Sequence, residues 1–369
     1  MYLTKLKLIN FKNYGEAELE FSKKINCFTG NNGAGKTNIL DAIYYLSFCK
    51  SYFNFVDSQN IKHKADFFAI HGTYKNQNEL NDLVNITQKR NSKKSFKFNK
   101  KEYERLADHI GKIPLVMVSP YDRDLINEGS DVRRKYIDGV ISQFDKNYLD
   151  NLLQYNKALA HRNALLRSFA ENRHFDAFSL QIWDKKLIEF GQPVFDKRKA
   201  FLQEFNPIFE KNYRFLSEGR EQVELVYESQ LALEPLGALL EKSVEKDRML
   251  RYTGKGVHKD DLLFKIDGYP IKKFGSQGQQ KTFVVAVKLA QFEYMRKVKN
   301  FKPVLLFDDI FDKLDHQRVN KIIQLVSNDN FGQVFITDTQ SERIEAIFEQ
   351  VDIDHKIFMV KQGNVKLYK

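Results

Sequence analysis

The stretch GNNGAGKT, at residues 30–37, constrains the fold of this chain more than any other part of its sequence. It fits the pattern G-x-x-x-x-G-K-[ST] of a phosphate-binding loop, which needs a strand before it and a helix after it. The preceding INCF is typical of a buried strand, and the following TNILDAIYYLSF has apolar residues at helical spacing. This order favours a nucleotide site over a glycine-rich turn that binds nothing.

The chemistry of such a loop gives its residues distinct roles. Glycines let backbone N–H groups converge on a phosphate, and the helix N-terminus adds a positive partial charge. The lysine would bridge the β- and γ-phosphates of ATP, and the threonine hydroxyl would bind Mg²⁺. The predicted nucleotide-binding residues of the loop are Gly30, Asn31, Asn32, Gly33, Ala34, Gly35, Lys36 and Thr37, with Lys36 also catalytic and Thr37 also a metal ligand.

A second motif supplies the acidic groups that a phosphate-binding loop requires. The segment PVLLFDDIF, at residues 303–311, reads as a buried strand that ends in two carboxylates. We expect Asp308 to bind the metal ion and Asp309 to polarise the attacking water. The alternative interpretation is a strand followed by an acidic helix cap.

A third motif, GSQGQ at residues 275–279, precedes an apolar helical stretch. Ser276 and Gln279 have the S-x-x-Q spacing of a capping box, which on its own indicates ordinary helix capping. Beside the other two motifs, the segment is similar to the signature of ABC-type ATPases, in which a serine and a glycine face the γ-phosphate held by the other subunit. Ser276 would then be catalytic and Gln279 would contact the nucleotide, although Gln277 replaces the first glycine of the transporter pattern.

The periodicity of the sequence changes twice along the chain. Residues 1–125 contain stretches of period two, residues 126–245 have apolar residues at helical spacing, and residues 246–369 return to α/β character. We therefore predict an α/β ATPase head, with a mixed sheet and the phosphate-binding loop, interrupted by a large α-helical insertion. Within the insertion we expect helix breaks near Gly191–Pro193 and at Pro207.

The charge pattern is that of a protein with a polyanionic partner. The net charge is +11, and the positive excess lies in the first 120 and the last 124 residues. A predicted hairpin with its turn at Asn99–Lys100 carries a basic stripe, which would suit DNA phosphates or would simply keep a solvated face soluble. Its candidate DNA-binding residues are Lys89, Arg90, Lys93, Lys94, Lys97, Lys100 and Lys101. Weaker candidates are Arg133, Arg134, Arg162 and Arg167.

The sequence also indicates where the protein works. No apolar run approaches the roughly 20 residues of a membrane-spanning helix, and the first residues lack the apolar core of a signal peptide. Cys27 and Cys49 are the only cysteines, and we expect both to be buried reduced thiols. These features predict a cytoplasmic protein with no membrane partner.

Several longer stretches resemble one family. They are LINFKNY, GNNGAGKTNILDAIYYLSFCKSY, VSPYDRDLINEGSDVRRKYID, LLQYNKALAHRNALL, GVHKDDLLF and SQGQQKT. Together they are similar to the ABC-type DNA-repair ATPases, the group that contains the SMC proteins, and within it to the bacterial RecF family. The resemblance covers nearly the whole chain.

This resemblance implies a function in DNA replication and recombinational repair. It implies weak, DNA-stimulated ATP hydrolysis, and an ATP-dependent homodimer on single-stranded, gapped or junction DNA, without sequence specificity. It further implies cooperation with the mediator proteins RecR and RecO in loading recombinase, and a link to the SOS response.

The resemblance also assigns residues outside the three motifs. Lys12 and Asn13 would lie near the nucleotide phosphates, and Asp315 would be an acid at the dimer interface. Asp338 would occupy the switch position where transporters carry a histidine. No Q-loop glutamine follows VMVSP, where Asp122 or Asp124 would have to substitute.

Two other functions fit a phosphate-binding loop. One is the nucleotide-binding subunit of an ABC transporter, against which stand the basic charge, the helical insertion and the missing switch histidine. The other is a phosphotransferase such as a kinase, which would leave the pairing of Ser276 with Gln279 unexplained.

Overall fold

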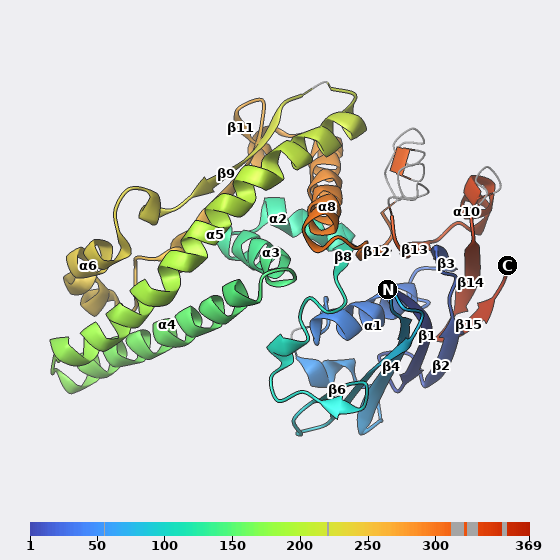
Figure 1. Ribbon diagram of the computed structural model, residues 1–369, viewed down its shortest axis with the longest axis horizontal. Helices are drawn as coiled ribbons and strands as arrows, with labels where there is room; N and C mark the ends of the chain where they lie inside the picture. Colours follow the sequence, from blue (N-terminus) through green and yellow to red (C-terminus); the bar gives the residue numbers. More distant parts are fainter. Residues whose placement is uncertain (55, 220, 311–320, 323–330, 349–352) are drawn as a thin grey trace. The chain divides into compact units, whose positions relative to one another are not determined.

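The structure is a computed structural model that describes residues 1–54, 56–219, 221–310, 321–322, 331–348 and 353–369 (Figure 1). The chain forms two compact units, which we call the head (residues 1–122 and 291–369) and the helical unit (residues 123–290). The prediction of an α/β protein with a helical insertion is therefore confirmed, and the first boundary lies three residues from the predicted one.

The second boundary was predicted at residue 245 and lies instead between residues 290 and 291, within the helix α8 (Gln277–Lys299). Residues 246–290 belong to the helical unit because strand β10 (Asp261–Ile266) pairs along its whole length with strand β9 (Val223–Glu228). The signature segment therefore lies in the helical unit rather than in the head. Sequence periodicity misplaced this boundary because it cannot distinguish a small sheet in an insertion from the return of the head sheet.

One sheet of the head is antiparallel, and its strands among the described residues follow the order β2-β1-β4-β5-β6-β7. Along β1, Leu6 and Leu8 are buried, whereas Lys7 points to the other face and pairs with Glu16 at 2.9 Å. The strands are β1 (Tyr2–Ile9), β2 (Glu16–Glu20), β4 (Phe67–Lys75), β5 (Asn81–Lys89), β6 (Ser95–Phe98) and β7 (Lys101–Glu102).

The other sheet of the head is mixed and has the order β15-β14-β3-β13-β12-β8. Between the strands that the structure describes, the pairs are parallel except that of β14 with β15. The carboxyl ends of β3, β12 and β13 therefore meet at one edge of the sheet, where ligands of such sheets bind. The strands are β3 (Ile25–Thr29), β8 (Leu115–Val118), β12 (Val304–Phe307), β13 (Val334–Asp338), β14 (His355–Lys361) and β15 (Asn364–Leu367).

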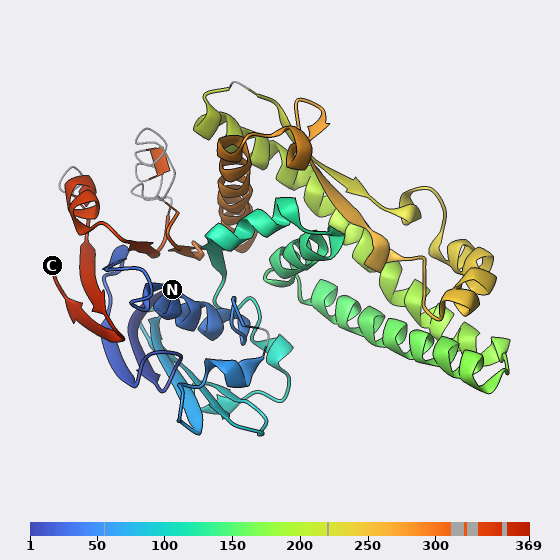
Figure 2. The same ribbon diagram turned by 180° about the vertical axis from the view of Figure 1, so that it is seen from behind.

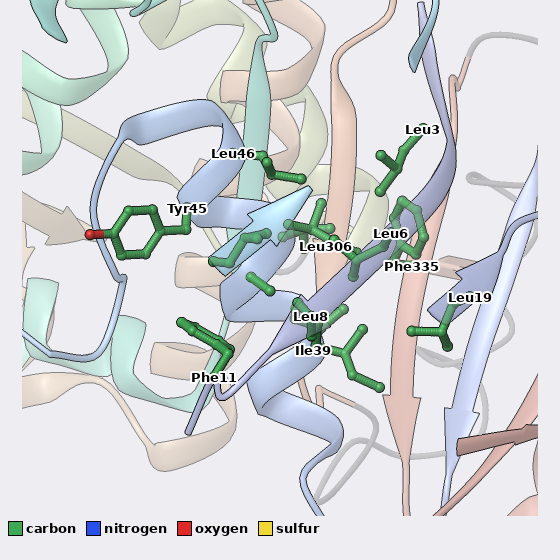
Figure 3. Packing of buried hydrophobic residues seen from close by; sticks show 14 of the residues in the cluster. Leu3, Leu6, Leu8, Phe11, Leu19, Ile39, Tyr45, Leu46, Leu306 and Phe335 are labelled. Atoms are coloured by element: carbon green, nitrogen blue, oxygen red, sulfur yellow. The ribbon is translucent and has the colours of Figure 1, made fainter. Parts of the chain in front are cut away.

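The helix α1 (Lys36–Phe48) shares one apolar core with both sheets. Figure 3 shows Leu8 of β1, Ile39 of α1 and Leu306 of β12 in this cluster, and all three are fully buried. Burying a leucine or isoleucine side chain contributes about 1.5–3 kcal/mol. The start of α1, and with it the end of the phosphate-binding loop, is thus fixed on a rigid base.

The head contains both cysteines of the chain and several short elements. Cys27 and Cys49 are both free and buried, as predicted, and burial raises the pKa of both thiols, that of Cys49 to about 12. The described part of the head also contains α10 (Ser341–Phe348) and 3₁₀ turns at Asp57–Asn60, Leu106–Asp108 and Pro120–Arg123.

The helical unit is built on two long antiparallel helices, α4 (Lys146–Asn172) and α5 (Ala177–Ser217), which lie side by side in both views (Figures 1 and 2). Asp145 and Asp176 cap their N-termini, each accepting backbone N–H groups through its carboxylate. The other elements are α2 (Asp124–Asn127), α3 (Ser130–Ser142), α6 (Leu236–Leu250), α7 (Ile271–Phe274), β11 (Tyr269–Pro270) and 3₁₀ turns at Gln230–Ala232 and Val257–Lys259.

The predicted breaks in α5 do not occur, because the helix runs through both Pro193 and Pro207. A proline inside a helix costs about 3 kcal/mol. This cost is offset by the buried apolar face of α5, which includes Phe201 and Phe209. Gly191 serves close packing: a side chain there would meet Leu236 of α6 at 2.9 Å and Tyr155 of α4 at 3.0 Å.

Candidate nucleotide-binding site

The phosphate-binding loop connects β3 to α1, as the sequence predicts. Gly30, Gly33 and Gly35 all have positive φ, at 144°, 77° and 115°, which other residues rarely adopt. A side chain at Gly30 would meet the carbonyl oxygen of Val360 at 2.2 Å, whereas none of the described atoms lies within 4 Å of one at Gly33. The loop is therefore packed at its base and open at its tip.

Lys36 turns its side chain back over the loop. Its Nζ donates hydrogen bonds to the carbonyl oxygens of Gly30, at 2.7 Å, and Asn31, at 3.1 Å, and the residue is only 3% exposed. A cation is thus held within the curve of the loop, at the N-terminus of α1. This position suits an anionic ligand.

The two halves of the predicted site meet at Asp308. Its N–H donates to the carbonyl oxygen of Val118, so the residue continues the edge of the sheet beyond β12. The hydroxyl of Thr37 donates to its Oδ1 at 2.8 Å. Burial raises the pKa of the Asp308 carboxyl to about 6, while hydrogen bonds from Thr37 and Thr337 oppose that rise.

Sequence reasoning gave no role to Thr337, which links both acids. Its Oγ1 donates to Oδ1 of Asp308 at 2.9 Å and accepts the N–H of Asp309, also at 2.9 Å. Its role follows from the register of the sheet rather than from the sequence. Phe307 pairs with Ile336, so the residues that follow them, Asp308 and Thr337, are neighbours.

Asp309 has a backbone conformation that is uncommon for residues other than glycine, with φ at 44°. Its Oδ1 lies 3.5 Å from the hydroxyl of Thr337. Unlike Asp308, it is half-buried rather than buried. Backbone strain of this kind is concentrated at functional sites.

Asp338, at the predicted switch position, has a structural role instead. Its carboxylate accepts the N–H of Gln340 at 2.8 Å and pairs with Arg343 of α10. The carboxylate therefore holds the start of α10, and the side chain of β13 that contacts the acid pair is that of Thr337.

Lys12 was predicted to lie near the nucleotide phosphates, but its ammonium is engaged elsewhere. Its Nζ lies 2.6 Å from Oδ2 of Asp41, a fully buried residue of α1. Asp41 also accepts hydrogen bonds from the hydroxyl of Ser51 and the N–H of Tyr52, both at 2.7 Å. A fully buried carboxylate needs a cationic partner, and this need accounts for the position of Lys12.

Asn13 does lie beside the loop, but behind it. Its Nδ2 donates to the carbonyl oxygen of Ala34 at 3.1 Å, and its Oδ1 accepts from Nδ2 of Asn38 at 2.8 Å. The amide is thus hydrogen-bonded to protein at both ends. Its contact is with the backbone of the loop, which differs from the predicted contact with phosphate.

The donor set at this edge of the sheet fits ATP with Mg²⁺. Mg²⁺ is usually held by one or two carboxylates together with substrate phosphates, a role that Asp308 and Thr37 suit. Among the described residues, no group of three or more His, Cys, Asp or Glu side chains could hold a metal ion by itself. With Asp308 and Thr37 as its protein ligands, the ion would bind jointly with the phosphates that Lys36 and the loop N–H groups hold.

The signature segment has the predicted capping box. The N–H of Ser276 donates to Oε1 of Gln279 at 2.7 Å, and the N–H of Gln279 donates to Oγ of Ser276 at 3.2 Å. Ser276 and Gly278 are exposed at the N-terminus of α8, whereas Nε2 of Gln279 donates to Glu221 at 3.0 Å. The capping box therefore leaves Ser276 and Gly278 exposed at the start of α8.

The basic hairpin forms as predicted, with Asn99 and Lys100 both at positive φ in its two-residue turn. Five of its cations are exposed, and Lys97 is half-buried. Lys94 points inward: its Nζ lies 2.6 Å from Oδ2 of Asp57 and donates to the carbonyl oxygen of Cys49. Because this ammonium is already paired inside the head, we remove Lys94 from the DNA-binding candidates.

The GVHKDDL motif, at residues 256–262, supplies two carboxylates that form ion pairs within the helical unit. Arg198, 2% exposed, donates to Asp260 at 2.9 Å and to Asp138 at 2.8 Å. Arg133 donates to both carboxylate oxygens of Asp261, at 2.8 and 2.9 Å. Burying such charges is favourable only when they are paired, so the motif fixes the packing of α3, α5 and β10.

Three arginines suggested by sequence as weak DNA-binding candidates are thereby engaged in internal contacts. Besides Arg133, Arg162 is fully buried between Asp184 and Asp247, and Arg134 donates to the backbone carbonyl of Asp260.

The proposed substitutes for a Q-loop glutamine are separated by the domain boundary. Asp122 closes a turn in the head, where it accepts the N–H of Ser119 and the hydroxyl of Tyr52. Asp124 begins α2 in the helical unit. Asp315 lies outside the described residues.

Comparison with known proteins places the chain in a family. The family described as RecF/RecN/SMC N terminal domain matches residues 2–366. The chain is 53% identical over 358 residues to the DNA replication and repair protein RecF of Flavobacterium johnsoniae, which covers 97% of this chain and 99% of that protein. The chain belongs to the RecF family. RecF of Phocaeicola vulgatus is 50% identical over 366 residues, covering 99% and 98% of the two chains.

Solved structures agree with membership of the RecF family. The structure of the recombination mediator protein RecF with ATP, in the RecFOR pathway, matches with a TM-score of 0.90 at 31% identity, covering 100% of this chain and 98% of that one. The Smc head domain of Pyrococcus furiosus, at 19% identity and a TM-score of 0.59, shares the fold alone. The predicted family and its function in DNA replication and repair are confirmed, and the transporter and kinase alternatives are set aside.

Proposed function

We propose that this RecF-family chain binds and hydrolyses ATP with Mg²⁺, and that ATP binding pairs two copies of the chain on DNA. The observation that carries this proposal is the meeting of Lys36, Thr37 and Asp308 at one edge of the mixed sheet. These residues come from segments about 270 positions apart, and together they supply the cation, hydroxyl and carboxylate of a phosphoryl-transfer site.

Each residue of the site has a part in the proposed reaction. Lys36 and the loop N–H groups bind the phosphates, and Thr37 with Asp308 would hold Mg²⁺, which neutralises phosphate charge when bound. Asp309 orients the attacking water and accepts its proton. Thr337 joins the two acids through its hydroxyl, which donates to the carboxylate of Asp308 and accepts the backbone N–H of Asp309.

We further propose that two copies pair head to tail when ATP is bound. Ser276 and Gly278 are exposed at the N-terminus of α8, a position that favours a phosphate group. Two composite sites would form, each with Lys36 from one copy and Ser276 from the other.

We expect Ser276→Arg to block ATP-dependent pairing while nucleotide binding to the monomer stays near that of the unmodified protein. The substitution places a bulky cation at the interface and also removes the helix cap, which costs about 1 kcal/mol. Asp176→Ala is the matched control, because it removes a cap in the same unit, at the start of α5. Sedimentation with and without ATP measures the dimer; an undiminished dimer in Ser276→Arg would exclude this arrangement.

We propose that the exposed cations of the basic hairpin contact DNA phosphates without reading sequence. They are Lys89, Arg90, Lys93, Lys100 and Lys101, with Lys97 half-buried beside them. Lys89, Lys97 and Lys101 lie in the paired strands β5, β6 and β7, and Arg90, Lys93 and Lys100 lie in the turns that join these strands. The cations are therefore close together along the hairpin, as contacts with successive phosphates require.

Replacing Lys93, Lys97 and Lys100 together with Gln should flatten the salt dependence of DNA binding by about two to three units of slope. This expectation follows from a slope of about 0.9 for each phosphate contact in a plot of log K against log salt. The control replaces the exposed Lys185, Lys186 and Lys199 of α5 with Gln, which changes the net charge equally. Equal slopes for the two variants would show that the hairpin is a solvated surface that does not contact DNA.

The relatives of the chain support a proposal for its partners and its location. The solved relative is described as part of the RecFOR pathway, which supports RecR and RecO as partners of this chain. Within the described part of the chain, no helix combines the length and apolar character needed to cross a membrane. We propose a cytoplasmic role at single-stranded, gapped or junction DNA, with ATP turnover that DNA stimulates.

A further inference from the structure

The back of the phosphate-binding loop is held by two segments from opposite ends of the chain. The carbonyl oxygen of Ala34 accepts a hydrogen bond from Nδ2 of Asn13 and another from the N–H of Gly363, both at 3.1 Å. The carbonyl oxygen of Gly35 accepts the hydroxyl of Tyr14 at 2.9 Å. Consecutive carbonyls of the loop are thus both anchored from outside it.

Anchoring these carbonyls also fixes the N–H groups that follow them. A peptide unit is planar and trans, so its C=O and N–H point in opposite directions. Fixing the C=O of Ala34 sets the N–H of Gly35, and fixing the C=O of Gly35 sets the N–H of Lys36. Both N–H groups belong to the N-terminal end of α1, where the proposed phosphate would bind.

The packing behind the loop leaves no room for a side chain at Gly35 or at Gly363. A side chain at Gly35 would meet Nδ2 of Asn13 at 2.4 Å and the hydroxyl of Tyr14 at 2.9 Å. One at Gly363 would meet the backbone oxygen of Asn13 at 2.8 Å. Asn38 in turn holds the Asn13 amide in place through a 2.8 Å hydrogen bond.

Tyr14 is placed to act as a permanent donor. The residue is fully buried, and burial raises the pKa of its hydroxyl, which therefore keeps its proton. Its hydroxyl has no titration near neutral pH to weaken the bond to Gly35.

We propose that Asn13, Tyr14 and Gly363 form a brace that sets nucleotide affinity by holding the loop N–H groups in their binding direction. The brace rests on the proposed binding of ATP at this loop. Its members are positioning residues, since each hydrogen-bonds the loop backbone from behind. Without these contacts the loop keeps fewer hydrogen bonds, among them that from the N–H of Asn38 to the carbonyl oxygen of Gly35 at 3.0 Å. The ligand must then order what the brace held, and binding weakens by the cost of that ordering.

Tyr14→Phe tests the brace by removing a single hydroxyl. We expect Kd for MgATP and for MgADP to rise about tenfold, in line with the loss of one buried hydrogen bond. KM for ATP should rise by a similar factor while kcat stays within about twofold, because the carboxylates are untouched.

Tyr74→Phe is the matched control. Tyr74 is fully buried in the same core, and its hydroxyl has no hydrogen-bond partner among the described residues. The same chemical change there should leave Kd and KM unaltered. Thermal unfolding of both variants without nucleotide separates a general loss of stability from an effect on the loop.

The outcomes distinguish the brace from the nucleotide site itself. If the unmodified chain binds ATP and Tyr14→Phe binds it equally well, the brace is excluded, even if its melting temperature falls. If the unmodified chain does not bind ATP at all, the proposed function fails first. A tenfold rise in Kd in Tyr14→Phe, with Tyr74→Phe unchanged, supports the brace.

Discussion

Lys36→Ala is expected to lose ATP binding by about a hundredfold or more and to reduce ATP turnover to background. The ammonium is the cation held within the loop, between the carbonyl oxygens of Gly30 and Asn31. Hydrogen bonds to a charged group contribute about 1.5–3 kcal/mol each, and this group would make more than one to the phosphates. Titration with a fluorescent ATP analogue and a phosphate-release assay measure the two losses.

Lys36→Arg is the comparison variant, because it keeps the positive charge and changes the shape of the cation. We expect it to retain part of the binding and to hydrolyse poorly, because a planar guanidinium cannot take the place of a compact ammonium in so close a loop. Unfolding curves for both variants exclude a folding defect. Turnover in Lys36→Ala equal to that of the unmodified chain would contradict the assignment of the loop.

The residues of the candidate site whose placement could be predicted from sequence are those set by local rules. The glycines, Lys36 and Thr37 lie within eight positions, and a strand before them with a helix after them determines their geometry. Asp308 was predictable for a similar reason, because a short apolar run must be buried and must deliver the next residue to the end of the strand.

The parts that sequence missed depend on partners far along the chain. Nothing near Lys12 or Lys94 shows that their ammonium groups pair with Asp41 and Asp57. Each of these pairings is made by the tertiary fold, so neither lysine could be excluded from ligand binding by its sequence context. Thr337 was missed because its role requires the register between β12 and β13.

The unbroken helix α5 shows the same limit for fold prediction. Proline lowers helix propensity strongly, so Pro193 and Pro207 each carry a local free-energy cost for helix formation. The outcome is decided by burial of the apolar face of the helix, which is a property of the packed helical unit. Local propensity yields to packing wherever the buried surface is large enough.

Asp309→Asn is expected to keep ATP binding and to slow hydrolysis by about a hundredfold or more, the usual scale of a general-base contribution. Asparagine suits this position because Asp309 has φ at 44°, a conformation that asparagine adopts more readily than most residues. The variant therefore retains the backbone, and with it the N–H that donates to Thr337. What it loses is a carboxylate able to orient water and accept its proton.

Asp308→Asn is the matched comparison, one residue earlier and with the same chemical change. Asp308 accepts the hydroxyls of both Thr37 and Thr337 and is buried, so it is placed to hold the metal ion. We expect this variant to lose the Mg²⁺ dependence of ATP binding, with affinity falling toward that measured in EDTA. The two neighbouring carboxylates should thus affect different steps.

The same pair of variants tests how hydrolysis is coupled to release from DNA. If ATP holds two copies together and its hydrolysis opens them, Asp309→Asn should stay on DNA longer than the unmodified chain, because the closed state persists. Dissociation from labelled DNA after a chase with excess unlabelled DNA measures this lifetime, and Asp308→Asn should dissociate at least as fast as the unmodified chain. Loss of ATP binding in Asp309→Asn, with binding retained in Asp308→Asn, would reverse the two assignments.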